Sequence, residues 1–198
     1  MAQKAKKVAR RKPKGDKRER TRAALLQAAR ALIREKGYER TTMEEVAARA
    51  GMTTGAIYGN FKNRDELFID LGHAYWPPIK PHIASGATFA QAMRAMARAT
   101  IAAVDERQPA AVGRLTGIAY ALQNAELRAR VRDFTKMSYD AGAEWLRGFD
   151  AKELPMPADQ LVRVIHCLIE GLVMQRILTP ELCPDKVFYS AFGALAKR

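Results

Sequence analysis

The stretch 41-TTMEEVAARAGMTTGAIYGNFKNRDEL-67 decides the fold around it, because it holds the start and stop signals of short helices. Thr42 and Glu45 form a capping box, in which the hydroxyl and the carboxylate each bind an amide left unpaired at a helix start. Gly51 follows where a residue in the left-handed region would end that helix, and glycine adopts this region without steric cost. The pattern predicts a short helix between Thr42 and Gly51.

A second short helix is predicted directly after the glycine. Thr53 can cap it, and Ile57 and Phe61 lie four residues apart on its apolar face. Asn63 and Glu66 repeat the capping pattern for a third helix start. Helix, glycine turn and helix form the helix-turn-helix layout, whose second helix lies in the DNA major groove. An ordinary helical hairpin has the same layout, so the exposed residues must distinguish the two.

A recognition helix needs small or polar side chains that reach base edges, with phosphate-binding groups beside it. The candidates inside or entering the groove are Thr53, Thr54, Gly55, Ala56, Tyr58 and Asn60, and Lys62 adds a positive charge beside them. The segment from Gly51 to Phe61 contains no Lys or Arg, so bidentate arginine contacts to guanine from this helix are excluded. Base discrimination would rest on hydroxyl and methyl contacts to thymine or adenine and on DNA shape.

Residues 20–70 resemble the DNA-binding domain of the tetracycline-repressor (TetR) family of bacterial transcriptional regulators. The matching positions are Ala28, Leu32, Gly37, Tyr38, Thr42, Val46, Ala47, Ala50, Gly51, Gly55, Ala56, Ile57, Tyr58, Phe61, Arg64 and Leu67. The resemblance implies that Tyr58 and Asn60 contact phosphates, as do Thr42 and Arg64 at the starts of their helices. The absence of a basic residue around Thr54 departs from many members of the family.

Charge is concentrated at the N-terminus. Residues 1–22 hold eleven Lys or Arg and two acidic residues, which is +9 of the formal net charge of +13. We predict that residues 1–19 form a disordered basic arm, because they combine high charge with few large apolar residues. The arm would either follow the DNA backbone or minor groove or serve only solubility.

The rest of the chain reads as helices, and no period-two alternation indicates a strand. Pro77, Pro78 and Pro81 end the helix that opens at Arg64, which predicts a DNA-binding domain over 20–76 and a second helical domain over 77–198. The resemblance implies that this helix transmits any ligand signal. An all-α fold of about nine helices follows, with further helices expected at 20–36, 89–108, 110–122, 124–148, 159–178 and 184–197.

Other function classes find little support in the sequence. No apolar run reaches the roughly 18 residues of a membrane span, and no signal peptide is expected. Two cysteines, Cys167 and Cys183, suit a reducing cytoplasm. With His166 they lack any recognised metal-ligand spacing. Phosphate-binding loops, a nucleophile elbow and paired-carboxylate motifs are missing, so we expect no enzyme, no metal and no cofactor.

The resemblance assigns two roles to the second domain. Its last two helices would form a four-helix dimer interface through Leu161, Ile165, Leu168, Leu172, Val187, Phe188, Ala191 and Leu195, unless they only close the core of one chain. A ligand pocket would use aromatic, methionine and sparse polar residues, although such stripes are also typical of plain core. The pocket candidates are Phe89, Met93, Met96, Tyr120, Phe134, Met137, Trp145, His166, Glu170 and Met174. A carboxylate in an apolar helix needs a partner or solvent, and His166, one turn earlier, could serve Glu170.

These features predict a homodimeric repressor in the bacterial cytoplasm, associated with the nucleoid. It would bind a palindromic operator in double-stranded DNA and leave it when an unknown small molecule binds. The alternative is a non-specific or architectural DNA-binding protein driven by the basic arm, which would lack a large affinity ratio between operator and random DNA.

Overall fold

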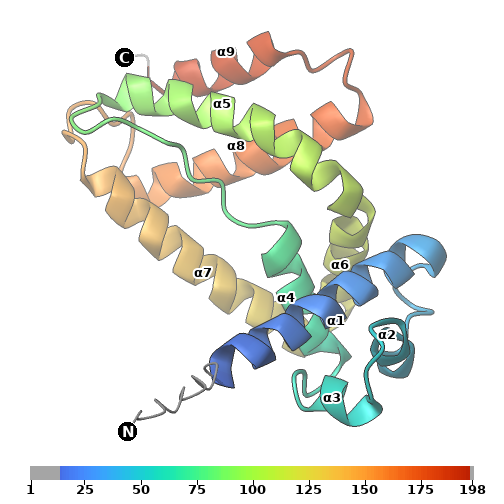
Figure 1. The fold of residues 1–198 in the computed structure, drawn as a ribbon. Helices are drawn as coiled ribbons and strands as arrows, with labels where there is room; N and C mark the ends of the chain where they lie inside the picture. The colour runs from blue at the N-terminus through green and yellow to red at the C-terminus, as the bar shows by residue number, and fades with distance from the viewer. Residues whose placement is uncertain (1–13, 197–198) are drawn as a thin grey trace, which may run out of the picture. The chain divides into compact units, whose positions relative to one another are not determined.

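The computed structural model describes residues 14–196, and all regular secondary structure in this part of the chain is helical (Figure 1). Nine α-helices and one short 3₁₀-helix occur among the described residues, so the predicted all-α fold is confirmed. Within the same range no helix is long and apolar enough to cross a membrane. The elements are α1 (Lys14–Lys36), α2 (Met43–Arg49), α3 (Thr54–Tyr58), α4 (Arg64–Tyr75), α5 (Phe89–Arg107), η1 (Gln108–Ala110), α6 (Ala111–Gln123), α7 (Ala125–Arg147), α8 (Ala158–Leu178) and α9 (Asp185–Leu195).

The first helix begins earlier than predicted. It starts at Lys14 instead of residue 20, so residues 14–19 are helical and do not belong to a disordered arm. The prediction relied on charge, yet Lys, Arg and Glu are all good helix formers. The rest of the predicted arm, residues 1–13, lies outside the described residues, as do residues 197–198.

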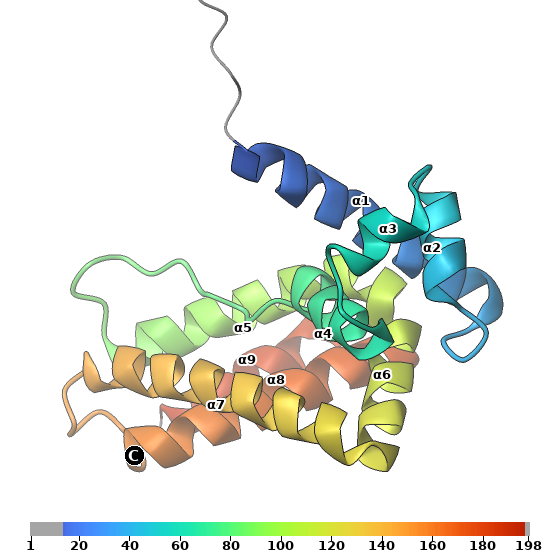
Figure 2. The ribbon, with the colours of Figure 1, turned by 90° about the horizontal axis from the view of Figure 1, so that it is seen from below.

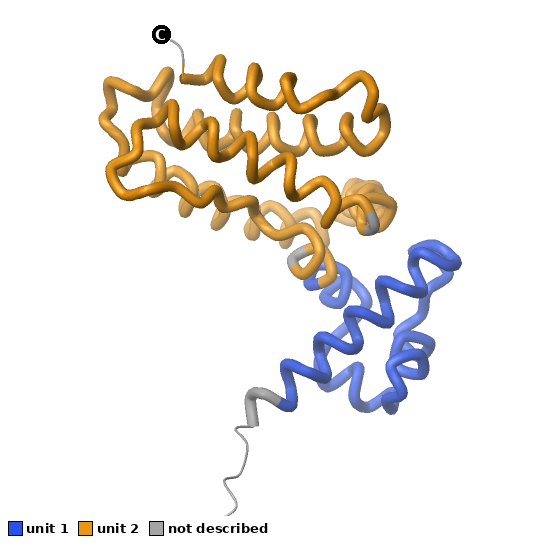
Figure 3. The backbone as a smooth tube through the Cα atoms, turned by 45° about the horizontal axis from the view of Figure 1, so that its top comes forward, with its two compact units in different colours: residues 1–70 blue, residues 71–198 orange. Residues whose placement is uncertain are grey.

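The chain divides into two compact units, residues 1–70 and 71–198 (Figure 3). The division falls inside α4 and not after Trp76, where the prolines suggested it. Packing explains the difference: Leu67 and Phe68 are buried in the early part of α4, whereas Trp76 belongs to the core of the second unit.

Residues of α1, α2 and α3 form the core of unit 1. The apolar face of α1 carries Leu25 and Ala29, neither of which is exposed to solvent. Val46 of α2, Ile57 of α3 and Phe61 after α3 are likewise fully buried. Removing such large apolar side chains from water is the main stabilising contribution to a domain of this size.

Unit 2 is built on α5, which packs against both α8 and α9, while α7 runs along α8 (Figures 1 and 2). Phe89, Met93, Leu161, Phe188 and Phe192 fill its core and are almost completely buried. Helix α6 is different, because only Ala111 and Ala121 of it are buried. Its larger apolar side chains are exposed, namely Val112, Leu115, Ile118 and Leu122.

Candidate DNA-binding interface

The start of α2 is fixed by the predicted capping box. The Thr42 hydroxyl accepts a hydrogen bond from the Glu45 amide at 3.2 Å, and the Glu45 carboxylate accepts one from the Thr42 amide at 2.9 Å. The ammonium of Lys36 pairs with the same carboxylate, and together with the Thr42 hydrogen bonds it lowers the pKa of Glu45 to about 2. Because the Thr42 hydroxyl also donates to Glu45 at 3.0 Å, both donors of Thr42 are directed at this carboxylate and not at solvent.

The turn between α2 and α3 depends on one glycine. Gly51 has φ of +67°, in the left-handed region. Its amide donates to Ala48 O at 3.0 Å, and the next amide, of Met52, donates to Ala47 O at 2.9 Å. These bonds satisfy carbonyls at the end of α2, and any side chain at position 51 would strain the backbone.

Helix α3 has an inward and an outward side. Thr53 caps it by accepting a hydrogen bond from the Ala56 amide at 3.2 Å. Ile57 points into the core of unit 1. The exposed positions are Thr54, Gly55 and Tyr58, and Ala56 is half-buried. The small side chains at the start of the helix would let its backbone approach a ligand closely.

Tyr58 links α3 to α2. Its side chain is 48% exposed, and its hydroxyl donates to Glu44 Oε1 at 3.0 Å. This bond and the negative charge of Glu44 raise the pKa of Tyr58. To bind a phosphate, the hydroxyl would have to turn away from this carboxylate.

Asn60 and Arg64 face the protein more than the solvent. Asn60 Nδ2 donates to Ala56 O at 2.8 Å, and its buried Oδ1 has no hydrogen-bond partner among the described residues. The Arg64 guanidinium donates to Tyr38 O and lies over the Tyr38 ring, 4.3 Å from its centroid. Lys62, by contrast, is exposed. Of the predicted set, the structure exposes Thr42, Thr53, Thr54, Gly55, Tyr58 and Lys62.

Arg22 of α1 also shapes this region, although the sequence did not single it out. Its Nη1 donates to Asn60 O at 2.6 Å, and its guanidinium pairs with Asp70 and lies 4.3 Å from the Phe61 ring centroid. Arg22 thus fixes the end of α3 against α1 and α4. No local pattern could have indicated this role, because Asn60 and Asp70 are 38 and 48 residues away.

The predicted ligand-pocket residues of unit 2 differ widely in their exposure to solvent. Phe89, Met93 and Met96 are buried in the core, and Met137 is 69% exposed. The remaining candidates are half-buried, namely Tyr120, Phe134, Trp145, His166, Glu170 and Met174. The suggested interaction of His166 with Glu170 is electrostatic: burial lowers the pKa of His166, and the negative charge of Glu170 opposes this shift. The His166 ring also lies edge-on to Tyr139 with centroids 5.3 Å apart, and Glu170 accepts a hydrogen bond from Trp76.

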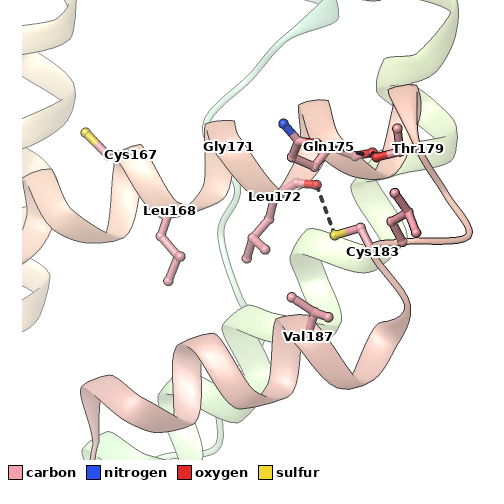
Figure 4. Close-up of a pocket in the computed structure, with 9 residues that line it drawn as sticks. Cys167, Leu168, Gly171, Leu172, Gln175, Thr179, Cys183 and Val187 are labelled. Atoms are coloured by element: carbon pink, nitrogen blue, oxygen red, sulfur yellow. Dashed lines mark hydrogen bonds between the residues drawn. The ribbon is translucent and has the colours of Figure 1, made fainter.

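The predicted dimer residues also separate into two groups. Leu161, Ile165, Leu172 and Phe188 are buried in the core of their own chain, and the half-buried residues are Leu168, Val187, Ala191 and Leu195. Between α8 and α9 lies an open groove of about 450 Å³, which Leu168, Gly171, Gln175 and Val187 help to line (Figure 4). No group of three or more His, Cys, Asp and Glu that could hold a metal ion occurs in the described part of the chain.

A capped helix, a left-handed glycine and a short exposed second helix define a helix-turn-helix DNA-binding domain. Residues 25–71 match the model of a family described as "Bacterial regulatory proteins, tetR family". The HTH-type transcriptional regulator TtgR of Pseudomonas putida is 45% identical over 47 residues, which cover 24% of this chain and 22% of TtgR. The sequence likeness to the tetR family is confined to this domain, and the chain matches about a fifth of the length of that relative.

Solved structures extend the likeness to both units. NalD, described as the secondary repressor of the MexAB-OprM multidrug efflux pump in Pseudomonas aeruginosa, superimposes with a TM-score of 0.58 at 21% identity, over 88% of this chain and 93% of NalD. SmeT in complex with triclosan gives a TM-score of 0.64 at 22% identity, over 90% of this chain and 92% of SmeT. At this identity the likeness shows a common fold.

The contacts of Arg64 predict a structural role that Lys62 lacks. Replacing Arg64 with Ala should lower the free energy of unfolding of unit 1 by about 1–2 kcal/mol, because a partly buried stacked guanidinium and its hydrogen bond are lost. Lys62→Ala is the matched control and should stay within about 0.5 kcal/mol of the parent, as exposed substitutions usually do. Thermal melts followed by circular dichroism compare the two, and equal melting temperatures would contradict this role for Arg64.

Proposed function

We propose that the chain is a dimeric, sequence-specific DNA-binding transcriptional regulator, namely a repressor released from a palindromic operator by a small molecule. The observation that carries the proposal is α3, whose inward residue Ile57 is fixed in the core while Thr54, Gly55 and Tyr58 remain exposed. This arrangement presents a rigid, small-residue surface, as entry into a major groove requires.

Different residues between Thr54 and Lys62 would contact the DNA bases and the DNA phosphates. Thr54 and Ala56 carry hydroxyl and methyl groups, which suit contacts to thymine or adenine edges. Lys62 and, after its hydroxyl turns from Glu44, Tyr58 would bind phosphates, which position a protein without reading sequence. Asn60 and Arg64 would contribute by holding the surrounding backbone, since their polar groups contact the protein itself.

One face of α8 supports a dimer. Its apolar members Val164, Leu168 and Leu178 are exposed or half-buried. Gly171 and Gln175 lie between them at spacings of three or four residues, so the five positions share one helix face. A two-fold dimer built on this face would match a palindromic operator with half-sites about one helical turn apart.

Repression and ligand release are supported by the related folds. NalD is described as a repressor, and SmeT was solved with triclosan bound. The alternative function is non-specific DNA binding through the basic N-terminal segment, most of which precedes residue 14. A selection of bound fragments from genomic DNA distinguishes the two, because only a sequence-specific dimer enriches one palindromic sequence.

In such a selection we expect two inverted half-sites about one helical turn apart. Thr54→Ala should change the preferred base at one or two symmetric positions, because a base-edge contact is worth about 1–3 kcal/mol of discrimination. Tyr58→Phe is the matched anchor variant and should enrich the unchanged sequence with weaker binding. If both variants alter the sequence alike, the division between reader and anchor is wrong, and if no sequence is enriched, the proposed function is wrong.

Gly171 offers a test of the dimer that spares the fold of each chain. A Cβ at this position meets no heavy atom within 4 Å, so Gly171→Glu should leave the monomer folded. In a dimer it would place an unpaired charge in an apolar interface, and we expect the variant to sediment as a monomer. Gly117→Glu on α6, where a Cβ is equally unobstructed, should remain dimeric. A dimeric Gly171→Glu protein would place the interface elsewhere.

A further inference from the structure

Three side chains from three segments of unit 2 surround the carboxylate of Glu170. Glu170, in the middle of α8, accepts a hydrogen bond at Oε1 from Trp76 Nε1 at 2.8 Å. Arg114 of α6 donates from Nη2 to its Oε2 at 3.3 Å, and Arg107, at the end of α5, places Nη1 3.6 Å from Oε1. The Arg107 guanidinium also lies over the Trp76 ring, 4.7 Å from the centroid.

The cluster contains more positive than negative charge. Two guanidiniums share the single carboxylate of Glu170, and the Arg107 side chain is only 4% exposed. Burial lowers the pKa of Arg107, which the negative charge of Glu170 only partly offsets. The charge of a neighbouring residue, Glu106, also acts on Arg107, but Glu106 is exposed to solvent. Arg107 also donates from Nη2 to Pro77 O at 2.6 Å, so its charge is met by one backbone carbonyl and by a carboxylate that it shares with Arg114.

Two buried donors of the arginines make no hydrogen bond with any described residue, namely Arg107 Nη1, which lies 3.6 Å from Glu170 Oε1, and Arg114 Nε. Buried donors without a hydrogen bond are costly, so a further acceptor at this place would be favourable. The number and charge of these donors fit the oxygens of an anionic group, which guanidiniums bind through several charge-assisted hydrogen bonds.

A cationic ligand at Glu170 fits less well. Trp76 and both arginines already contact the Glu170 carboxylate. A positively charged ligand there would be repelled by the two guanidiniums. The electrostatics therefore favour an anion over a cation at this place.

The adjoining surface indicates what would be attached to the anionic group. Arg107 also lines a groove of about 490 Å³, formed by the end of α4, the proline segment after it and α5. Its walls include Pro78 and Ile79 together with small residues of α5 such as Ala99 and Ala103. This volume is within the usual range of small-molecule sites, and the apolar wall suits an apolar body.

We propose that Arg107 and Arg114 form the head-group site for an amphipathic organic anion, a carboxylate with an apolar tail or ring. Glu170 orients both guanidiniums and competes with the ligand for them, and its bond to Trp76 connects the site to the segment that follows α4. This proposal rests on the proposed function only where it treats the anion as the small molecule that releases the protein from DNA. Binding of the anion itself is measured without DNA.

Isothermal titration calorimetry of the full chain with octanoate, octan-1-ol and octyltrimethylammonium tests the proposal, since the three probes carry similar straight alkyl tails and differ in the charge of their head group. We expect octanoate to bind at least about tenfold more tightly than either other probe, the size of effect that a charge-assisted hydrogen bond gives. In a Trp145→Phe background Trp76 is the sole tryptophan, and its fluorescence should change on octanoate binding.

Three variants make the test specific. Arg114→Gln, chosen because its side chain is partly exposed and the fold should tolerate the change, should weaken octanoate binding at least about tenfold. Arg94→Gln removes the same charge from an exposed position of α5 and should have no effect. Glu170→Gln should strengthen octanoate binding, because it removes the competing charge while keeping an acceptor for Trp76.

The proposal is overturned if octanoate binds no better than the alcohol or the cation, or if Arg114→Gln and Arg94→Gln behave alike. A Glu170→Gln protein that binds octanoate no more tightly than the parent would also overturn it. Sequence-specific DNA binding by the same protein without octanoate binding refutes only this inference. Octanoate binding without sequence-specific DNA binding leaves the inference standing and refutes the proposed function.

Discussion

The proposed DNA-binding surface depends on one constraint: α3 is five residues long and cannot be stable by itself. Its conformation is imposed by the Thr53 cap at one end and by the burial of Ile57 and Phe61 against α1 and α2 at the other. Arg22 closes the arrangement from α1, since it contacts both the Asn60 carbonyl and the Phe61 ring. The exposed residues of α3 are therefore positioned by the interior of unit 1.

Much of unit 1 could be predicted because its signals are local. A capping box joins atoms three residues apart, and the Thr42–Glu45 and Asn63–Glu66 bonds occur where the sequence places them. The left-handed conformation of Gly51 follows from the same short-range geometry. The predicted ranges 89–108 and 159–178 likewise agree closely with α5 and α8. Periodicity and capping describe helices well, which is why an all-α fold could be predicted without any long-range information.

The chemistry of individual polar residues could not be predicted in this way. Arg64 contacts Tyr38, Tyr58 binds Glu44, and Glu170 binds Trp76, over separations of 26, 14 and 94 residues. These pairings depend on how helices pack, which no window of sequence reveals. The start of α1 shows a different limit, because the same charged residues favour disorder through low hydrophobicity and favour helix through their propensity.

Three cations of unit 1 pair with its own carboxylates, in the pairs Lys36–Glu45, Arg49–Glu35 and Arg22–Asp70. The proposed sequence-specific binding depends on the shape and contacts of α3. The central claim is tested most directly by measuring affinity for a selected palindromic site and for random DNA across a salt series. The account predicts a ratio of at least about 10³ that persists while both affinities fall with salt. A ratio near one at every salt concentration would contradict it.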